Sequence, residues 1–107
     1  MNTKIEFTTA DIKKIYDQSV IYQCACPAQL CMAILQLKDV YKYQLNCGKK
    51  DTIDIQIHDH IAQSTEIAHE ELVRCLRKIL EIDGWDLEKL EISENARLKK
   101  LNNTATA

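Results

Sequence analysis

Glycine and proline are scarce in this sequence: two glycines and one proline occur in 107 residues. Folds made entirely of β-strands need many tight turns, and such turns depend heavily on these two residue types. The scarcity therefore predicts an all-α fold in which a few long helices are joined by short loops. One domain is expected, because a chain of this length has no room for two independent cores.

The overall composition is that of an ordinary globular protein, with 46% hydrophobic and 28% charged residues. The net charge is −2, and neither half of the chain forms a charged tail of the kind that binds nucleic acid or a membrane surface. No apolar run approaches the roughly 20 residues that a membrane helix needs, and no signal sequence opens the chain. We therefore expect a cytoplasmic protein that binds neither nucleic acid nor membranes, with its five cysteines mostly reduced.

Two helices are predicted in the first half of the chain. The first covers residues 9–17, with Thr8 as its cap, and gives way to an extended segment over residues 20–23. The second begins at Pro27, which suits the first helical position because its missing N–H would have no partner there. Gly48 closes this helix, since glycine readily adopts the left-handed conformation that ends many helices.

The longest predicted helix starts at Asp51 or Thr52 and ends before Gly84. Two alternatives remain open along it: residues 53–58 alternate as a strand would, and the helix could break near Ser64. A short helical turn over residues 85–90 then leads to a last helix. The prediction is thus a bundle of about four helices built on a long antiparallel pair.

The last predicted helix covers residues 94–101. Residues 1–101 then form a single helical domain, and residues 102–107 form a disordered tail.

Apolar residues occupy two adjacent stripes on the long helix, at 100° per residue. The first stripe consists of Ile57, Ile61, Ser64, Ala68, Leu72, Cys75, Ile79 and Ile82. The second consists of His58, Ala62, His69, Val73, Leu76 and Leu80. We expect the first stripe to face the second helix, which would bury Leu37, Tyr41, Leu72, Cys75 and Ile79 between the two helices.

The second stripe is the predicted interface of a homodimer. An unbroken helix of about 30 residues is about 45 Å long, whereas a globule of this size has a radius of gyration of about 13 Å. Such a helix projects beyond its own domain unless it bends or a second copy covers the excess. Two copies related by a twofold axis would bury the stripe on both at once. The predicted interface residues are His58, Ala62, His69, Val73, Leu76 and Leu80.

Three cysteines that lie close together in sequence, Cys24, Cys26 and Cys31, are the candidate metal ligands. Cys26 would cap the second helix, where the helix dipole lowers the pKa of a thiol. A closed zinc site needs four ligands, and this cluster supplies two or three for zinc or an iron–sulfur cluster. The alternative is structural, because cysteine is among the most often buried residue types; by this interpretation Cys31 and Cys75 pack in the core.

No catalytic motif occurs in the sequence: it has no glycine-rich phosphate loop, no nucleophile elbow and no H-E-x-x-H zinc motif. The sequence therefore predicts a small helical interaction or regulatory protein that has no catalytic site or cofactor, forms a homodimer and can bind another protein. The alternative hypothesis is a metal- or redox-responsive protein that uses Cys24 and Cys26. A third is an enzyme whose site forms only in the dimer.

Overall fold

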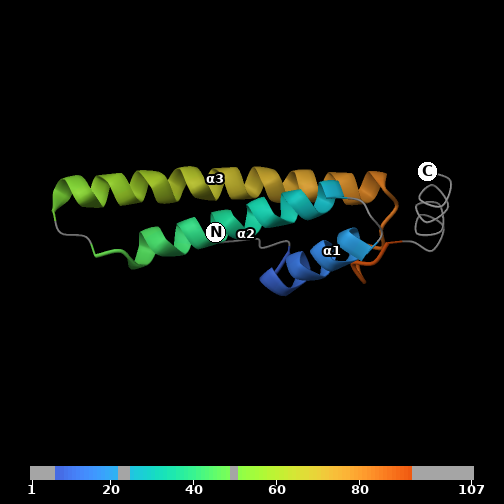
Figure 1. The fold of residues 1–107 in the computed structure, drawn as a ribbon. Helices are drawn as coiled ribbons and strands as arrows, with labels where there is room; N and C mark the ends of the chain where they lie inside the picture. Colours follow the sequence, from blue (N-terminus) through green and yellow to red (C-terminus); the bar gives the residue numbers. More distant parts are fainter. Residues whose placement is uncertain (1–6, 22–24, 49–50, 93–107) are drawn as a thin grey trace.

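The computed structural model describes residues 7–21, 25–48 and 51–92. Within these ranges the chain forms three helices, α1 (Thr9–Ile21), α2 (Ala25–Asn46) and α3 (Thr52–Ile82). Helices α2 and α3 lie side by side and run in opposite directions, and α1 lies against the first half of α2 (Figure 1). The predicted all-helical class is confirmed.

The described residues contain three helices rather than about four. The fourth helix, predicted over residues 94–101, and the tail at 102–107 lie outside the described residues. Residues 85–90, predicted as a short helical turn, form hydrogen-bonded turns but no helix, and the loop that contains them is described as far as Ile92.

Helix α1 begins with a reciprocal pair of capping hydrogen bonds. The backbone N–H of Asp11 donates to Oγ1 of Thr8 at 3.0 Å, and the N–H of Thr8 donates to the Asp11 carboxylate at 2.9 Å. This is a capping box with Asp in place of the usual Glu. The helix is longer than predicted and continues to Ile21. In its second half the buried Ser19 hydroxyl donates to the carbonyl of Ile15 at 2.8 Å, so this polar group is satisfied within the helix. The predicted extended segment is therefore wrong as far as Ile21.

Helix α2 starts earlier than predicted, at Ala25. Cys26 and Pro27 therefore lie inside its first turn, and Cys26 is not the capping residue. The end of α2 also differs from the prediction, because Gly48 does not adopt a left-handed conformation. Among the glycines of the described residues, only Gly84 has a positive φ.

Helix α3 is one unbroken helix of 31 residues, about 46 Å long. Its predicted N-cap is confirmed, because the Asp51 carboxylate accepts a hydrogen bond from the N–H of Asp54 at 2.9 Å. The two alternatives that the sequence left open, a strand over residues 53–58 and a break near Ser64, are both wrong.

The end of α3 is fixed by Gly84, whose φ of 78° is left-handed. The N–H of Gly84 donates to the carbonyl of Glu81 at 3.1 Å, and the N–H of Trp85 donates to the carbonyl of Leu80 at 3.0 Å. These two bonds make a Schellman motif, and the buried side chains of Trp85 and Leu80 supply the hydrophobic contact that accompanies it.

The loop after α3 folds back over the end of the bundle. Its ends are joined by a 2.8 Å hydrogen bond from the N–H of Asp86 to the carbonyl of Glu91. The Lys14 ammonium of α1 donates to the carbonyl of Lys89 at 2.7 Å, which fastens the loop to the first helix. As a result, Leu90 is buried in the core.

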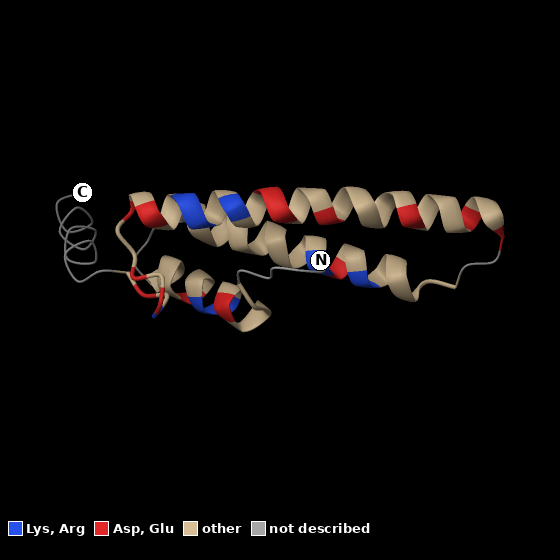
Figure 2. Cartoon of the chain, turned by 180° about the vertical axis from the view of Figure 1, so that it is seen from behind, with Lys and Arg blue, Asp and Glu red and all other residues tan. Residues whose placement is uncertain are grey.

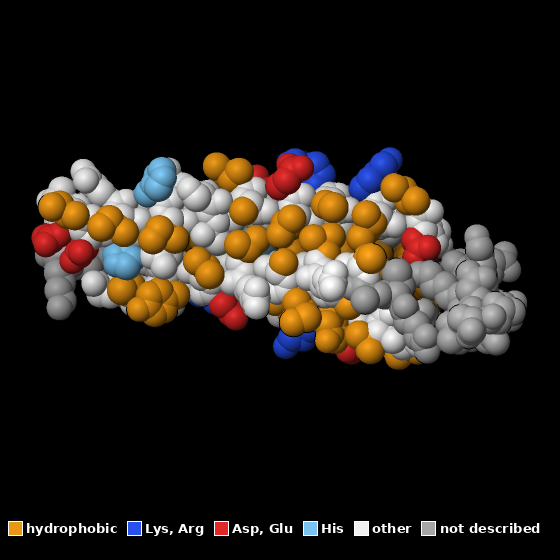
Figure 3. All heavy atoms as spheres, turned by 45° about the horizontal axis from the view of Figure 1, so that its top comes forward, with side chains coloured by type: hydrophobic (Ala, Val, Ile, Leu, Met, Phe, Trp, Pro, Cys, Tyr) orange, Lys and Arg blue, Asp and Glu red, His pale blue; other side chains and the backbone are white. Residues whose placement is uncertain are grey.

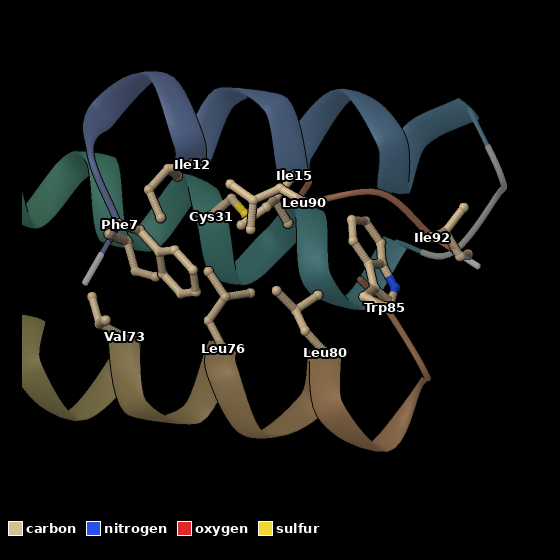
Figure 4. Packing of buried hydrophobic residues seen from close by; sticks show 11 residues of the cluster. Phe7, Ile12, Ile15, Cys31, Val73, Leu76, Leu80, Trp85, Leu90 and Ile92 are labelled. Atoms are coloured by element: carbon tan, nitrogen blue, oxygen red, sulfur yellow. The ribbon is translucent and has the colours of Figure 1, made fainter. Parts of the chain in front are cut away.

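One hydrophobic core joins the three helices and this loop at one end of the molecule (Figure 4). Each helix supplies side chains that are completely inaccessible to solvent. They are Ile12 and Ile15 of α1, Cys31 and Ile34 of α2, and Leu76 and Leu80 of α3. The core is closed by Phe7, Val73, Trp85, Leu90 and Ile92.

The two apolar stripes of α3 have exchanged roles relative to the prediction. The second stripe is the buried one, and His69, Val73, Leu76 and Leu80 all face the interior. Among the five residues predicted to lie between the long helices, Cys75 is exposed. The other four, Leu37, Tyr41, Leu72 and Ile79, are half-buried. The reason is that α2, Phe7 and the loop after α3 all meet the side of α3 that carries Leu76.

The molecule is elongated, because α1 and the loop cover only one end of α3 (Figure 1). The radius of gyration is 17.1 Å and the extents are 60 × 26 × 18 Å. A compact globule of this length has a radius of gyration of about 13 Å. The first half of α3 therefore packs on α2 alone, and its isoleucines reach the surface, as at Ile53, Ile55, Ile57 and Ile61.

Candidate interaction surface

The three candidate metal-binding cysteines have different environments. Cys24 lies outside the described residues, Cys26 is exposed at the start of α2, and Cys31 is fully buried in the core beside Ile12 and Ile15 (Figure 4). Burial raises the pKa of the Cys31 thiol to about 12, so this thiol stays protonated at neutral pH. Within residues 7–21, 25–48 and 51–92, no three metal-ligating side chains come together.

The residues predicted as a dimer interface lie on the side of α3 that faces α2 and the hydrophobic core of the same chain. At one end of this stripe, Nδ1 of His58 donates a hydrogen bond to the Oε1 atom of Gln44 on α2. At the other end Leu76 and Leu80 are completely buried. Because α2 and the core already cover this stripe, it is not the surface that the chain leaves open.

His69 is the most unusual polar residue of the buried stripe. Its side chain is 5% exposed, and its Nε2 atom has no hydrogen-bond partner in the described part of the chain. Burial, and then the nearby positive charge of Lys38, lower the pKa of His69 below its usual value. The imidazole is therefore neutral at pH 7, and charging it would place an uncompensated cation in the interior.

The open stripe, as we call the first stripe from here on, consists of Ile57, Ile61, Ser64, Ala68, Leu72, Cys75, Ile79 and Ile82. None of these residues carries a charge. Ile57 is 49% exposed, and each of the others is exposed or half-buried. From Ile57 to Ile82 the stripe extends about 37 Å along the helix.

The side of α2 next to the open stripe is also apolar. Gln44 marks the direction from α2 to α3, because it bonds to a side chain of α3. Lys38 marks the direction to α1, because its ammonium donates to Oγ1 of Thr9 at 2.9 Å. At 100° per residue, Ala33 and Val40 lie about 20° and 40° from Gln44 on the flank away from α1, and Leu37 lies about 20° from Gln44 on the other flank. All three side chains are exposed or half-buried.

The open stripe and these three residues together form what we call the apolar face. Figure 3 shows hydrophobic side chains in a row along α3 and on the adjoining surface of α2. Charged residues border this face rather than interrupt it, with Glu71 and Lys78 along α3 and Asp39 on α2. Acidic residues occur along the whole of α3, whereas its basic residues are confined to the second half (Figure 2).

Sequence reasoning found the residues of the open stripe but placed them in the core. The signal was the helical repeat of apolar residues, which is equally strong for both stripes. The apolar side of α2 was not predicted, because Ala33 and Val40 do not stand out from the other apolar residues of that helix.

Comparison with known proteins found no matching family model, no similar curated protein and no similar solved structure. None of the helices in the described ranges is long and apolar enough to cross a bilayer. The apolar face is therefore interpreted from its own chemistry.

Proposed function

We propose that this chain is a small cytoplasmic interaction protein that has no catalytic site and works as a homodimer. The observation that carries the proposal is the apolar face on the antiparallel pair of α2 and α3. It is continuous and uncharged, and it lies on regular helices rather than on loops. The largest apolar patch of a typical monomer covers about 300–600 Å² and often has a function in binding.

The shape of the molecule gives independent support. An unbroken helix of 31 residues, packed on one other helix along its first half, leaves large isoleucines in contact with water. Their exposure has a cost of about 25 cal/mol for each Å² of apolar surface, and a partner that covers the face removes this cost.

Native mass spectrometry of the freshly purified protein tests the proposal. One chain has a mass of 12.3 kDa, so the expected species has twice this mass and no bound metal. A metal-free monomer would contradict the homodimer. Stoichiometric metal on a monomer would instead favour a metal-responsive protein that uses Cys24 and Cys26.

A further inference from the structure

We infer that a second copy of this chain docks on the apolar face, on the side of the α2–α3 pair that faces away from α1. This inference rests on the proposed homodimer and names the surface that forms it. The stripe of Leu76 and Leu80, which the sequence indicated, stays inside each subunit.

The apolar face is large enough for a small dimer interface. The open stripe is about 37 Å long at 1.5 Å per residue, and the α2 part of the face, from Ala33 to Val40, is about 10 Å long. With a helix diameter of about 10 Å, the two parts together cover about 470 Å² of one subunit. A twofold contact would bury this area on both subunits, about 950 Å² in total, which is the lower end of the size range of protein–protein interfaces.

The charge pattern suits a twofold contact. In such a contact a surface meets a copy of itself, so any charge at its centre would face a like charge. The apolar face has no charge at its centre, and its borders carry both signs, with Glu71 and Lys78 along one edge. An apolar centre inside a charged rim is the usual composition of a protein interface.

No other element of the described ranges covers this face. Helix α1 lies on the other side of α2, where Lys38 bonds to Thr9. The longest segment outside the described residues, 93–107, has two large apolar side chains, Leu98 and Leu101. Two leucines cannot cover a stripe that is about 37 Å long.

Sedimentation velocity of two matched variants tests the inference. Ile57→Glu puts a charge into the apolar face. Ile67→Glu puts the same charge on the same helix but outside this face, because Ile67 points about 100° away from Ala68 of the open stripe. Both isoleucines are exposed in the single chain, at 49% and 69%, so both variants are expected to fold, as circular dichroism can verify. We expect Ile57→Glu to raise the dissociation constant at least about tenfold, because two unpaired charges enter an apolar interface, and Ile67→Glu to leave it unchanged.

Alkylation of Cys75 gives a second readout that does not depend on the folding of a variant. Its thiol is exposed in the single chain and belongs to the open stripe. In the wild type, labelling of the Cys75 peptide should slow as the protein concentration rises through the dissociation constant. In Ile57→Glu this slowing should move to concentrations at least about tenfold higher, and in Ile67→Glu it should occur at the same concentrations as in the wild type.

The outcomes separate the inference from the proposed function. Suppose that the wild type is dimeric. The inference is then overturned, and the homodimer stands, if Ile57→Glu dimerises as tightly as the wild type or if Cys75 of the wild type is labelled equally fast at all concentrations. A wild type that is monomeric at about 100 μM, well above the dissociation constants of stable dimers, overturns both.

Discussion

Two leucines one turn apart on α3 allow a direct test of which side of this helix holds the fold together. Leu76 is completely buried within the core (Figure 4). Leu72 belongs to the open stripe, is half-buried and packs against the edge of this core. Both lie well inside the helix, so replacement by alanine changes the helix propensity equally at the two positions. The difference between Leu76→Ala and Leu72→Ala therefore reports burial alone.

The expected magnitudes follow from the exposure of each side chain. Truncation of a fully buried leucine removes its transfer free energy and leaves a cavity, so Leu76→Ala should lower the free energy of unfolding by about 3–4 kcal/mol. At half-buried Leu72 the transfer contribution is about half as large and solvent fills the space, which gives about 1–2 kcal/mol. For a domain of this size the larger loss corresponds to a fall in melting temperature of about 15 °C.

Urea denaturation followed by far-UV circular dichroism measures both losses. The measurement is best made in the Ile57→Glu background, because dimerisation would otherwise add a stabilisation that grows with the logarithm of protein concentration. A loss for Leu72→Ala that equals or exceeds the loss for Leu76→Ala would refute the assignment of the buried stripe.

Two further predictions concern single residues. Gly84→Ala should lower the free energy of unfolding by about 1–2 kcal/mol, because the φ of Gly84, 78°, is left-handed. Gly48→Ala should be close to neutral, because the added Cβ meets no atom within 4 Å, and thermal melts compare the two variants. The pKa of His69 is lowered in the folded chain, mainly by burial, so below about pH 6.5 the unfolded state takes up the proton more readily and stability falls as the pH decreases. Urea titrations between pH 5 and pH 8, with steps of about one unit, should therefore show a loss of stability on the acid side. His69→Phe should reduce this loss, and the control His60→Gln, at an exposed position, should retain it. Equal pH profiles for the wild type and His69→Phe would contradict this prediction.

Local signals in the sequence correctly predicted the start of α1 and both ends of α3. Thr8 and Asp51 cap their helices through their own side chains, and Gly84 ends α3 through its own backbone freedom. Each of these interactions joins residues that are at most a few positions apart, so the sequence contains all the information that determines them. Gly48 shows the limit, because a glycine permits a left-handed turn without requiring one.

The packing of α3 could not be predicted, because it depends on partners far away in sequence. The two stripes have the same helical repeat, and the buried one contains His58 and His69, which made it the less apolar choice. Gln44 provides a hydrogen-bond partner for His58, and the sequence alone does not place these two residues together. The exposed position of Cys75 follows from the same choice of face.

The cysteine cluster was predictable as a sequence pattern but not as a site. The structural alternative holds for Cys31, whose thiol lies in the core with its pKa raised to about 12 by burial. The start of α2 at Ala25 rather than at Pro27 removed the capping role predicted for Cys26. A shift of two residues at a helix end is small, yet it changes which residue can cap the helix.

The most direct test of the apolar face as the dimer contact is an isotope-filtered nuclear Overhauser experiment on a mixture of labelled and unlabelled protein. Only contacts between different subunits give signals in such a sample. We predict signals from the methyl groups of Ile57, Ile61 and Ile79 to the other subunit, and none from Leu76 or Leu80. Signals from Leu76 and Leu80, or no signal from the isoleucines, would contradict the account.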